Sequence, residues 1–382
     1  MGATIFVGKE TDALETRVAG SPETVKKMVS LGLEVIVQKG AGADSQIPDS
    51  AFEAAGAKIG TAADAKKADV VLRVRRPAEA EIKNLKKGAV VLAQMDPYGN
   101  EKALSALAKA GVTAFAMELM PRITRAQSMD VLSSQANLAG YQAVIEAAHA
   151  FTRAMPMMMT AAGTVPAAKV FVMGAGVAGL QAIATARRLG AAVSATDVRP
   201  AAKEQVASLG AKFIAVEDDE FKAAETAGGY AKEMSKEYQA KQAALVADHI
   251  AKQDIVITTA LIPGRPAPKL ISADMVRSMR DGSIIVDLAV ERGGNVEGSK
   301  AGETVTVGGV TIIGIPNLAG RVAASASLLY AKNLLTFLET MIDKETKSVS
   351  VNLSDELVKA TALTHDGALV HPAFGGETSK GA

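Results

Sequence analysis

The stretch KVFVMGAGVAGLQAIATARRLGAAVSATDVRP, residues 169–200, decides the fold. Its apolar run at 170–173 is too short for a helix and is bounded by a glycine, so it predicts a buried strand. Three glycines in G-x-G-x-x-G spacing follow, and after them a helical pattern at 180–189. A second apolar run, 191–196, predicts another strand, which ends at Asp197. This order of elements is typical of a βαβ unit that binds a dinucleotide.

Each glycine of this turn has a physical reason. Gly174 lets the chain turn sharply out of the strand, and Gly176 has no Cβ, so a pyrophosphate can approach the backbone. Gly179 lets helix and strand pack closely, and the helix N-terminus offers free N–H groups to the phosphates. A turn that needs glycine only for packing would look the same. Asp197 favours the nucleotide, because it lies about twenty residues on, where a carboxylate accepts both ribose hydroxyls.

The same carboxylate favours NAD(H) over NADP(H), because it would repel a 2′-phosphate. Arg199 is a counter-argument, although an arginine two residues past a strand is more often solvated. Val177, at the helix start, and Val198, next to the acid, complete the predicted cofactor-binding set.

Length, charge and composition exclude several classes. The chain has 382 residues, a net charge of +1 and no cysteine. The length is comfortable for two domains, and the charge gives no electrostatic footprint for nucleic acid. Without cysteine there are no disulfides or thiolate zinc sites, and we predict no metal site. No signal peptide is visible, and the longest nearly uncharged region, 154–186, is interrupted by prolines, a lysine and glycines, so we expect a soluble chain.

Strand and helix signals alternate over residues 1 to about 120, which predicts a parallel sheet with helices on both faces. The expected strands are 4–7, 34–37, 70–74, 89–93 and 112–116. The expected helices are 21–31, 79–85 and 101–110. No glycine turn follows the first strand, so this part should be Rossmann-like in shape without holding a nucleotide. Near the C-terminus, 348–371 predicts two short strands joined by a turn at 365–367.

Long helical patterns at 130–152 and 322–342 are expected to carry the chain into a second domain and back. Further strands of that domain are expected at 212–216, 254–258, 283–287 and 311–315. The predicted fold class is therefore α/β, with two Rossmann-like parallel-sheet domains linked by long helices, the second inserted into the first. We assign residues 1–135 and 325–382 to the first domain and residues 136–324 to the NAD(H)-binding domain.

Polar residues at helical spacing follow Pro121, and three to four positions separate the members that share one face. They are Arg122, Arg125, Gln127, Asp130 and Ser133 or Ser134. An amide, a carboxylate, hydroxyls and guanidinium groups near a helix start suit the carboxamide and ribose of a nicotinamide nucleotide. In the alternative, Ser128 or Asp130 only caps the helix and the other residues form a solvated face, and periodicity leaves both open.

A charged segment, 217–242, contains the hinge signal Gly228-Gly229, with Tyr230 and Met234 on one helical face. Such a segment could close over a bound nucleotide, because a tyrosine and a methionine can cover an apolar ring and exclude water. An exposed insertion is the alternative.

Acid–base residues are missing from the predicted nicotinamide face. Reducing a carbonyl requires a proton donor, usually His or Lys, beside the hydride path. The histidines occur in helical or tail contexts far from that face, at His149, His249, His365 and His371. The sequence therefore indicates a site that holds NAD(H) without acid–base equipment.

Three segments, RITRAQSMDVLSSQANLAGYQAV, MMMTAAGTVPAAKVFVMGAGVAGLQAIATARRLGA and TAGGYAKEM, resemble a known family. With them, nearly the whole chain is similar to the α subunit, or NAD(H)-binding domain I, of proton-translocating nicotinamide nucleotide transhydrogenase. The residues that the resemblance places around the nicotinamide and its ribose are Arg122, Gln127, Asp130 and Ser133. Those that it places on the remainder of the cofactor are Gly174, Gly176, Gly179 and Asp197, with Tyr230 and Met234 at the tip of a closing loop.

The resemblance also implies an activity and partners. Hydride would pass directly between NADH on this chain and NADP⁺ on a partner subunit, towards which the counterpart of Gln127 reaches. A membrane-spanning subunit would conduct the protons, and this chain would be cytoplasmic, peripheral on the inner membrane through its partners. The family is dimeric in this domain, which implies a homodimer.

Alanine dehydrogenase shares this architecture and is the main alternative. That family resembles RVRRP, residues 73–77, but has a substrate-binding Lys where Arg75 stands and a catalytic His at the position of Asp96. Arg17 is kept, yet without that Lys and His the amino-acid chemistry lacks its proton donor. A non-catalytic NAD-binding protein is the other alternative.

Overall fold

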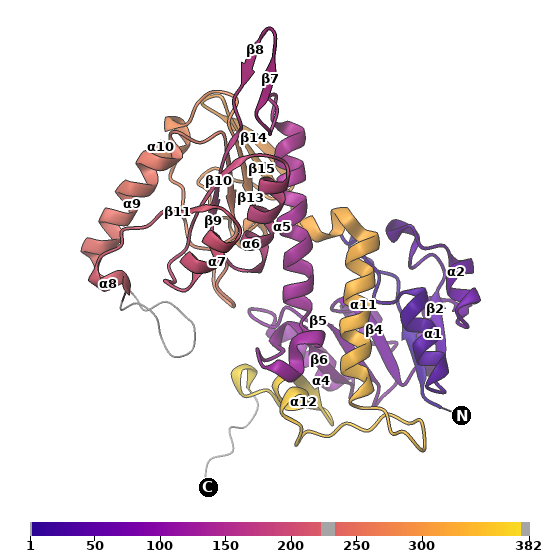
Figure 1. Cartoon of the computed structure of the whole chain (residues 1–382). Coiled ribbons are helices and arrows are strands. Elements are labelled where there is room, and N and C mark those ends of the chain that lie inside the picture. The colour runs from indigo at the N-terminus through magenta and orange to yellow at the C-terminus, as the bar shows by residue number, and fades with distance from the viewer. Residues whose placement is uncertain (1, 223–233, 376–382) are drawn as a thin grey trace. The chain divides into compact units, whose positions relative to one another are not determined.

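The structure, a computed structural model, describes residues 2–222 and 234–375 (Figure 1). The chain divides into two compact units, the first formed by Met1–Gln135 and Ala319–Ala382 and the second by Ala136–Leu318. Each unit contains a twisted sheet with helices on its faces. The predicted class, α/β with two Rossmann-like units of which the second is inserted into the first, is confirmed.

The first unit contains, within the described residues, an eight-stranded sheet. Its strands are β1 Thr4–Val7, β2 Glu34–Gln38, β3 Lys58–Gly60, β4 Val70–Arg75, β5 Val90–Gln94, β6 Thr113–Ala116, β16 Ala362–His365 and β17 Ala368–Leu369. They lie in the order β17-β16-β6-β5-β4-β1-β2-β3. The six strands from β3 to β6 are parallel, as predicted, whereas β16 and β17 add an antiparallel edge.

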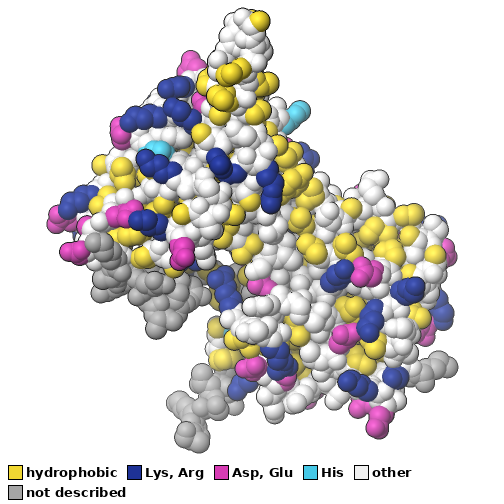
Figure 2. All heavy atoms as spheres, in the orientation of Figure 1, with side chains coloured by type: hydrophobic (Ala, Val, Ile, Leu, Met, Phe, Trp, Pro, Cys, Tyr) yellow, Lys and Arg dark blue, Asp and Glu magenta, His cyan; other side chains and the backbone are white. Residues whose placement is uncertain are grey.

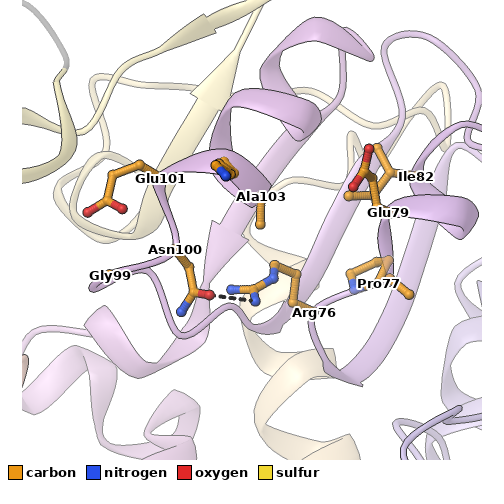
Figure 3. Close-up of a pocket in the computed structure, with 10 residues that line it drawn as sticks. Arg76, Pro77, Glu79, Ile82, Gly99, Asn100, Glu101 and Ala103 are labelled. Atoms are coloured by element: carbon orange, nitrogen blue, oxygen red, sulfur yellow. Dashed lines mark hydrogen bonds between the residues drawn. The ribbon is translucent and has the colours of Figure 1, made fainter.

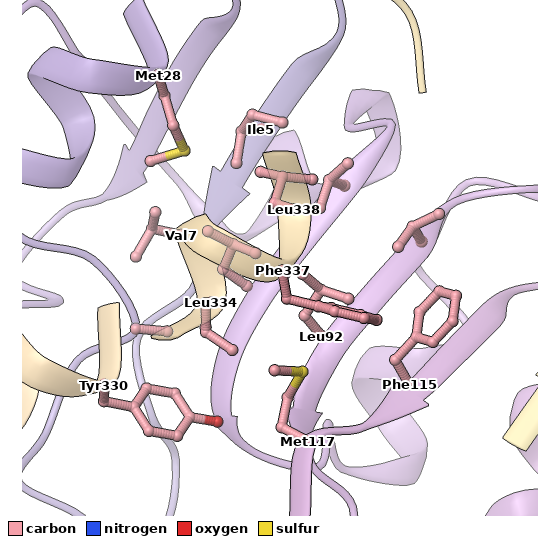
Figure 4. Packing of buried hydrophobic residues seen from close by; sticks show 14 of the residues in the cluster. Ile5, Val7, Met28, Leu92, Phe115, Met117, Tyr330, Leu334, Phe337 and Leu338 are labelled. Carbon is pink, nitrogen blue, oxygen red and sulfur yellow. The ribbon is translucent and has the colours of Figure 1, made fainter. Parts of the chain in front are cut away.

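Helices cover both faces of this sheet. They are α1 Pro22–Ser30, α2 Asp49–Ala54, α3 Glu79–Ile82, α4 Glu101–Lys109, α11 Ala323–Glu339 and α12 Glu356–Thr361. On one face, α11 buries Leu334 and Phe337, and the Phe337 ring meets Phe115 edge-on at 5.4 Å between centroids (Figure 4). On the other face, α4 buries Leu104 and Leu107. Each such side chain contributes about 1.5–3 kcal/mol through burial.

The predicted C-terminal hairpin is confirmed, but its surroundings differ from the prediction. β16 and β17 pair across Asp366 and Gly367, which have positive φ angles of 48° and 81°. The region before them, expected to be extended, contains the helix α12. Asp355 starts this helix, because its carboxylate accepts hydrogen bonds from the N–H groups of Leu357 and Val358.

The second unit contains a seven-stranded sheet in the described part of the chain. Its strands are β9 Lys169–Met173, β10 Ala192–Thr196, β11 Lys212–Phe213, β12 Ile255–Thr258, β13 Ile284–Asp287, β14 Glu303–Val307 and β15 Val310–Gly314. They lie in the order β11-β10-β9-β12-β13-β15-β14, parallel except for β14. The sequence analysis placed the other six strands, although β11 is shorter than predicted, and it missed β14.

The helices of the second unit include one that begins in the first. They are α5 Val131–Ala150, α6 Val177–Arg188, α7 Ala202–Ser208, α8 Asp219–Lys222, α9 Lys236–Ile250 and α10 Ala273–Ser278. The long helix α5 passes the unit boundary after Gln135. Gly140 allows α5 to touch α6, since a Cβ on it would lie 2.0 Å from the carbonyl oxygen of Ala178.

A two-stranded hairpin follows α5 in the second unit, where the sequence analysis saw only a methionine-rich turn. It consists of β7 Met158–Thr160 and β8 Gly163–Val165, which are exposed throughout and extend away from the sheet of their unit (Figure 1). No helix of the described chain is long and apolar enough to cross a membrane.

His249, on α9, is held neutral inside the second unit. Its Nε2 lies 2.8 Å from Ser194 Oγ, and its ring meets Phe171 edge-on at 4.7 Å between centroids. Burial lowers the pKa of His249 below 6.5, and the positive charges of Lys212 and Lys252 lower it further. The unfolded chain therefore binds this proton more readily than the folded chain does.

We expect the free energy of unfolding to fall as the pH drops through 6.5, until the pH passes below the lowered pKa of His249. Urea denaturation between about pH 7.5 and pH 5 measures this loss. The variant H249Q keeps a hydrogen-bonding side chain but does not titrate, so its loss should be smaller. Equal losses in the two proteins would contradict this account.

Candidate functional site

The glycine turn lies at the carboxyl end of β9, where the strand order of the second sheet reverses. In open α/β sheets, this position is the ligand crevice. Gly174 has a φ of 106°, and a Cβ on Gly179 would lie only 1.8 Å from the Gly174 carbonyl oxygen. Around a Cβ on Gly176, in contrast, no described atom would lie within 4 Å. The turn therefore packs tightly on one side and is open on the side where a pyrophosphate would need room.

Helix α6 starts directly at this open position. Gly176 is its N-cap and supplies no side-chain acceptor, so the first N–H groups of the helix receive none from the cap. The partial positive charge of a 12-residue helix then favours an anion at Val177, which is 40% exposed.

Asp197 connects the end of β10 to the glycine turn. Its Oδ2 accepts the N–H of Ala175 at 2.7 Å, and its Oδ1 accepts the N–H of Arg199 at 2.9 Å. The Arg199 guanidinium pairs with the same carboxylate, with Nε 2.9 Å from Oδ1 and Nη2 3.1 Å from Oδ2. This hydrogen bonding raises the pKa of Arg199. Arg199 is therefore ion-paired over the turn, whereas a solvated side chain was the ordinary expectation, and Val198 between the two is exposed.

The loop after β12 forms the other side of the turn. Thr259 Oγ1 donates to the Gly174 carbonyl at 3.1 Å. The side chain of Asn295 holds the next residue by both backbone groups, since its Oδ1 accepts the Ala260 N–H at 3.1 Å and its Nδ2 donates to the Ala260 carbonyl at 2.9 Å. Asp287 Oδ1 in turn accepts the N–H of Asn295 at 3.2 Å. The sequence analysis missed Thr259 and Asn295, and the signal closest to them was an acid at the end of a predicted strand.

The polar residues after Pro121 belong to the first unit. They occupy a 3₁₀ helix, Thr124–Met129, and the first turn of α5. Asp130 and Ser133 are brought together, because Asp130 Oδ1 accepts the Ser133 N–H at 2.9 Å and Oδ2 accepts its hydroxyl at 2.5 Å. Asp130 thus caps α5, as the simpler interpretation held, while Arg122 and Gln127 are exposed.

The predicted closing loop is described only at its end. Tyr230 lies outside the described residues. Met234 is half-buried just before α9, and its carbonyl accepts a hydrogen bond from Gln239 Nε2 at 2.8 Å.

Ion pairs occupy the strand-order reversal of the first sheet, between β1 and β4. Glu10 accepts from Arg73 Nε at 3.0 Å and from the Val74 N–H at 2.8 Å. Glu15 accepts from both Nε and Nη2 of Arg17 at 2.7 Å. Burial raises the pKa of Glu10 despite the attraction of Arg73. Protein charges therefore fill the position that the glycine turn leaves open in the second sheet.

A pocket in the first unit lies beyond the carboxyl ends of β4 and β5 (Figure 3). Arg76 lines it, but this guanidinium donates to the Asp96 carbonyl at 3.1 Å and to Asn100 Oδ1 at 3.2 Å. The acids Glu79 and Glu101 also line the pocket. The strand order does not reverse here, so the pocket does not have the features of a nucleotide site.

Comparison with known proteins places these features in a family. Residues 6–139 match the model described as "Alanine dehydrogenase/PNT, N-terminal domain", and residues 143–372 match "Alanine dehydrogenase/PNT, C-terminal domain". Together the two models span most of the chain.

The relatives and structures that the chain resembles include transhydrogenase subunits. It is 58% identical over 380 residues to an NAD(P) transhydrogenase subunit alpha of Rhodospirillum rubrum, covering 98% of this chain and 99% of that one. The same subunit of Rickettsia prowazekii is 47% identical, covering 95% of each chain. The crystal structure of transhydrogenase from Sinorhizobium meliloti has a TM-score of 0.89 and 69% identity, covering 96% of this chain and 100% of that one. This chain therefore belongs to the alanine dehydrogenase/PNT family and, within it, to the NAD(P) transhydrogenase alpha subunits.

Proposed function

We propose that this chain is the NAD(H)-binding subunit of a proton-translocating transhydrogenase and passes hydride directly between NADH and NADP⁺ held on a partner subunit. The observation that carries the proposal is the glycine turn of an alpha subunit, open at Gly176 and tied to Asp197 through Ala175. These groups fit the pyrophosphate and adenosine ribose of NAD(H).

The chain's residues bind, orient and exclude water. In the proposal, the glycine turn holds the pyrophosphate, and the adenosine ribose lies on Asp197 with Val198 and Arg199 beside it. Around the nicotinamide and its ribose are Arg122, Gln127, Asp130 and Ser133, with Tyr230 and Met234 closing over them. NADH supplies the hydride, and transfer requires the two rings within about 3–3.5 Å of each other. Gln127, which is exposed in this chain, would border the surface where the partner subunit docks.

No proton donor is needed between two nicotinamides, and three histidines have local partners instead. Nε2 of His249 lies 2.8 Å from Ser194 Oγ, and Nδ1 of His365 lies 3.0 Å from Thr113 Oγ1. His371 accepts the Ala373 N–H at 3.2 Å. These contacts support catalysis by proximity, orientation and exclusion of water.

Two positions argue against alanine dehydrogenase. Arg75 stands where that enzyme has a lysine, and its Nε donates to Glu15 at 2.8 Å. Asp96 stands where that enzyme has its histidine, and its N–H donates to the carboxylate of Glu118 at 2.5 Å. Neither side chain can do the work of a neutral lysine or histidine in proton transfer.

We further propose a homodimer, held at the cytoplasmic face of the inner membrane by an NADP(H)-binding subunit and a membrane-spanning proton-channel subunit. The hairpin of β7 and β8 supports a protein contact, because Met157, Met158, Met159 and Val165 are 61%, 43%, 76% and 37% exposed. Figure 2 shows hydrophobic side chains gathered there. A two-stranded hairpin is marginally stable alone, so it gains from packing on another chain.

Mixing the chain with a purified NADP(H)-binding transhydrogenase subunit tests the proposal. We expect the chain alone to bind NADH, seen as a change in nucleotide fluorescence, without reducing an NADP⁺ analogue. Addition of the partner should start reduction of the analogue. Reduction by the chain alone, or no reduction with the partner, would contradict the proposal. Oxidation of NADH with pyruvate and ammonia would instead indicate alanine dehydrogenase.

A further inference from the structure

The segment that carries the proposed nicotinamide residues is anchored on its inner side. Ala126 and Met129 are 1% and 4% exposed and belong to the core that α11 covers. Gln127, between them, is exposed. The inner residues therefore determine where the outer side chain stands.

One buried side chain of α11 binds this segment at two points. Asn333 is 7% exposed, and its Nδ2 donates to the carbonyl of Ser128 at 2.8 Å. Its Oδ1 accepts the hydroxyl of Ser134 at 2.7 Å. Ser128 directly follows Gln127, and Ser134 directly follows Ser133, so the two hydrogen bonds bracket Asp130. Asn333 thus holds the 3₁₀ helix and the first turn of α5 in one register.

The network continues into buried groups of the same unit. Gln135, 6% exposed, accepts from Arg17 Nη1 at 2.8 Å and donates to the carbonyl of Ala326 at 3.1 Å. It also donates to Ser134 Oγ at 3.2 Å. Every polar atom of this chain of contacts has a partner, which gives it a single arrangement.

We infer that Asn333 is a positioning residue for hydride transfer, an inference that rests on the proposed function. It does not touch the nucleotide. It fixes the backbone from which Gln127 and Asp130 project, and a displacement of about 1 Å at a hydride-transfer site can cost about 100-fold in rate. Its removal leaves the Ser128 carbonyl and the Ser134 hydroxyl without this partner, so the segment relaxes while the core packing remains.

The test is the variant N333L, which keeps the size of the side chain and loses both hydrogen bonds. With the NADP(H)-binding subunit and saturating nucleotides, we expect its turnover to fall about 10- to 100-fold. The Kd for NADH, measured by fluorescence with the full chain, should change less than about threefold, since the pyrophosphate turn lies elsewhere in the chain. S134A should lose less, and S134A/N333L no more than N333L, because the two side chains act as one unit.

T336A is the matched control, because Thr336 also lies on α11 but its hydroxyl donates only to the Lys332 carbonyl within the helix. Its turnover should equal that of the wild type. Wild-type turnover in N333L, or a loss confined to NADH affinity or thermal stability, overturns the inference while the proposed function stands. If the wild-type chain transfers no hydride with the partner, the proposed function fails and the inference falls with it.

Discussion

Gly179→Ala is expected to weaken NADH binding by at least about 100-fold, the largest loss from any single methyl group added to the nucleotide site. The new Cβ would lie 1.8 Å from the Gly174 carbonyl oxygen and 2.8 Å from its carbon. Both are backbone atoms, so α6 and the glycine turn must move apart. That movement displaces Gly176 and the helix N-terminus together. Isothermal titration with NADH measures the loss, and thermal unfolding should show a destabilisation of roughly 1–3 kcal/mol.

Gly176→Ala is the matched control for the fold. No described atom lies within 4 Å of its added Cβ, and the backbone at Gly176 is extended. The variant should therefore unfold at the wild-type temperature and still bind NADH less tightly, because its methyl group occupies the side that a pyrophosphate approaches. NADH binding of wild-type strength by Gly179→Ala would refute the account of the turn.

Asp197→Asn is expected to raise the Kd for NADH about 30- to 100-fold, or roughly 2–3 kcal/mol. The substitution removes the negative charge that pairs with Arg199 and that would accept the ribose hydroxyls. It also weakens the acceptor for the Ala175 N–H, which connects β10 to the glycine turn. The variant therefore loses affinity through both recognition and geometry.

The same variant should shift the choice between the two dinucleotides. A neutral residue 197 no longer repels a 2′-phosphate, and Arg199 becomes available to attract one. The ratio of the Kd for NADPH to that for NADH should fall more than about tenfold. Asp248→Asn is the control, since Asp248 is an exposed acid of α9 paired with Lys252, and it should change neither constant. A ratio that stays constant or rises in Asp197→Asn would disprove the specificity argument.

Sequence analysis identified the elements that are both apolar and local. The runs that became β1, β4, β9 and β13 are buried along nearly their whole length, so hydrophobicity alone marks them. The missed strands lack this signal. β14, with the sequence ETVTV, alternates polar and apolar residues at a sheet edge, and β7 and β8 are exposed on every residue. The short helix α12 depends on the single cap of Asp355.

The candidate site divides along the same line. The glycine turn and Asp197 lie within one short stretch, so their spacing could be recognised. Asn333 and Ser128 are 205 positions apart, and Asn295 and Ala260 are 35 apart. No periodicity relates residues at such distances, and only the folded chain brings them within hydrogen-bonding reach. The pairing of Arg199 back onto Asp197 was missed for another reason, because side-chain direction does not follow from spacing.

The insertion of one unit into the other determines the order of events during synthesis. All strands of the second sheet are complete by Gly314, before the ribosome has added α11. The first sheet must wait for α11 and β16, which come from the last part of the chain, so the apolar face beneath Leu334 and Phe337 stays open until then. Domains fold as units as they emerge, and exposed apolar surface invites aggregation. The first unit is therefore begun first and finished last, and the segment bearing Gln127 becomes set only when Asn333 docks.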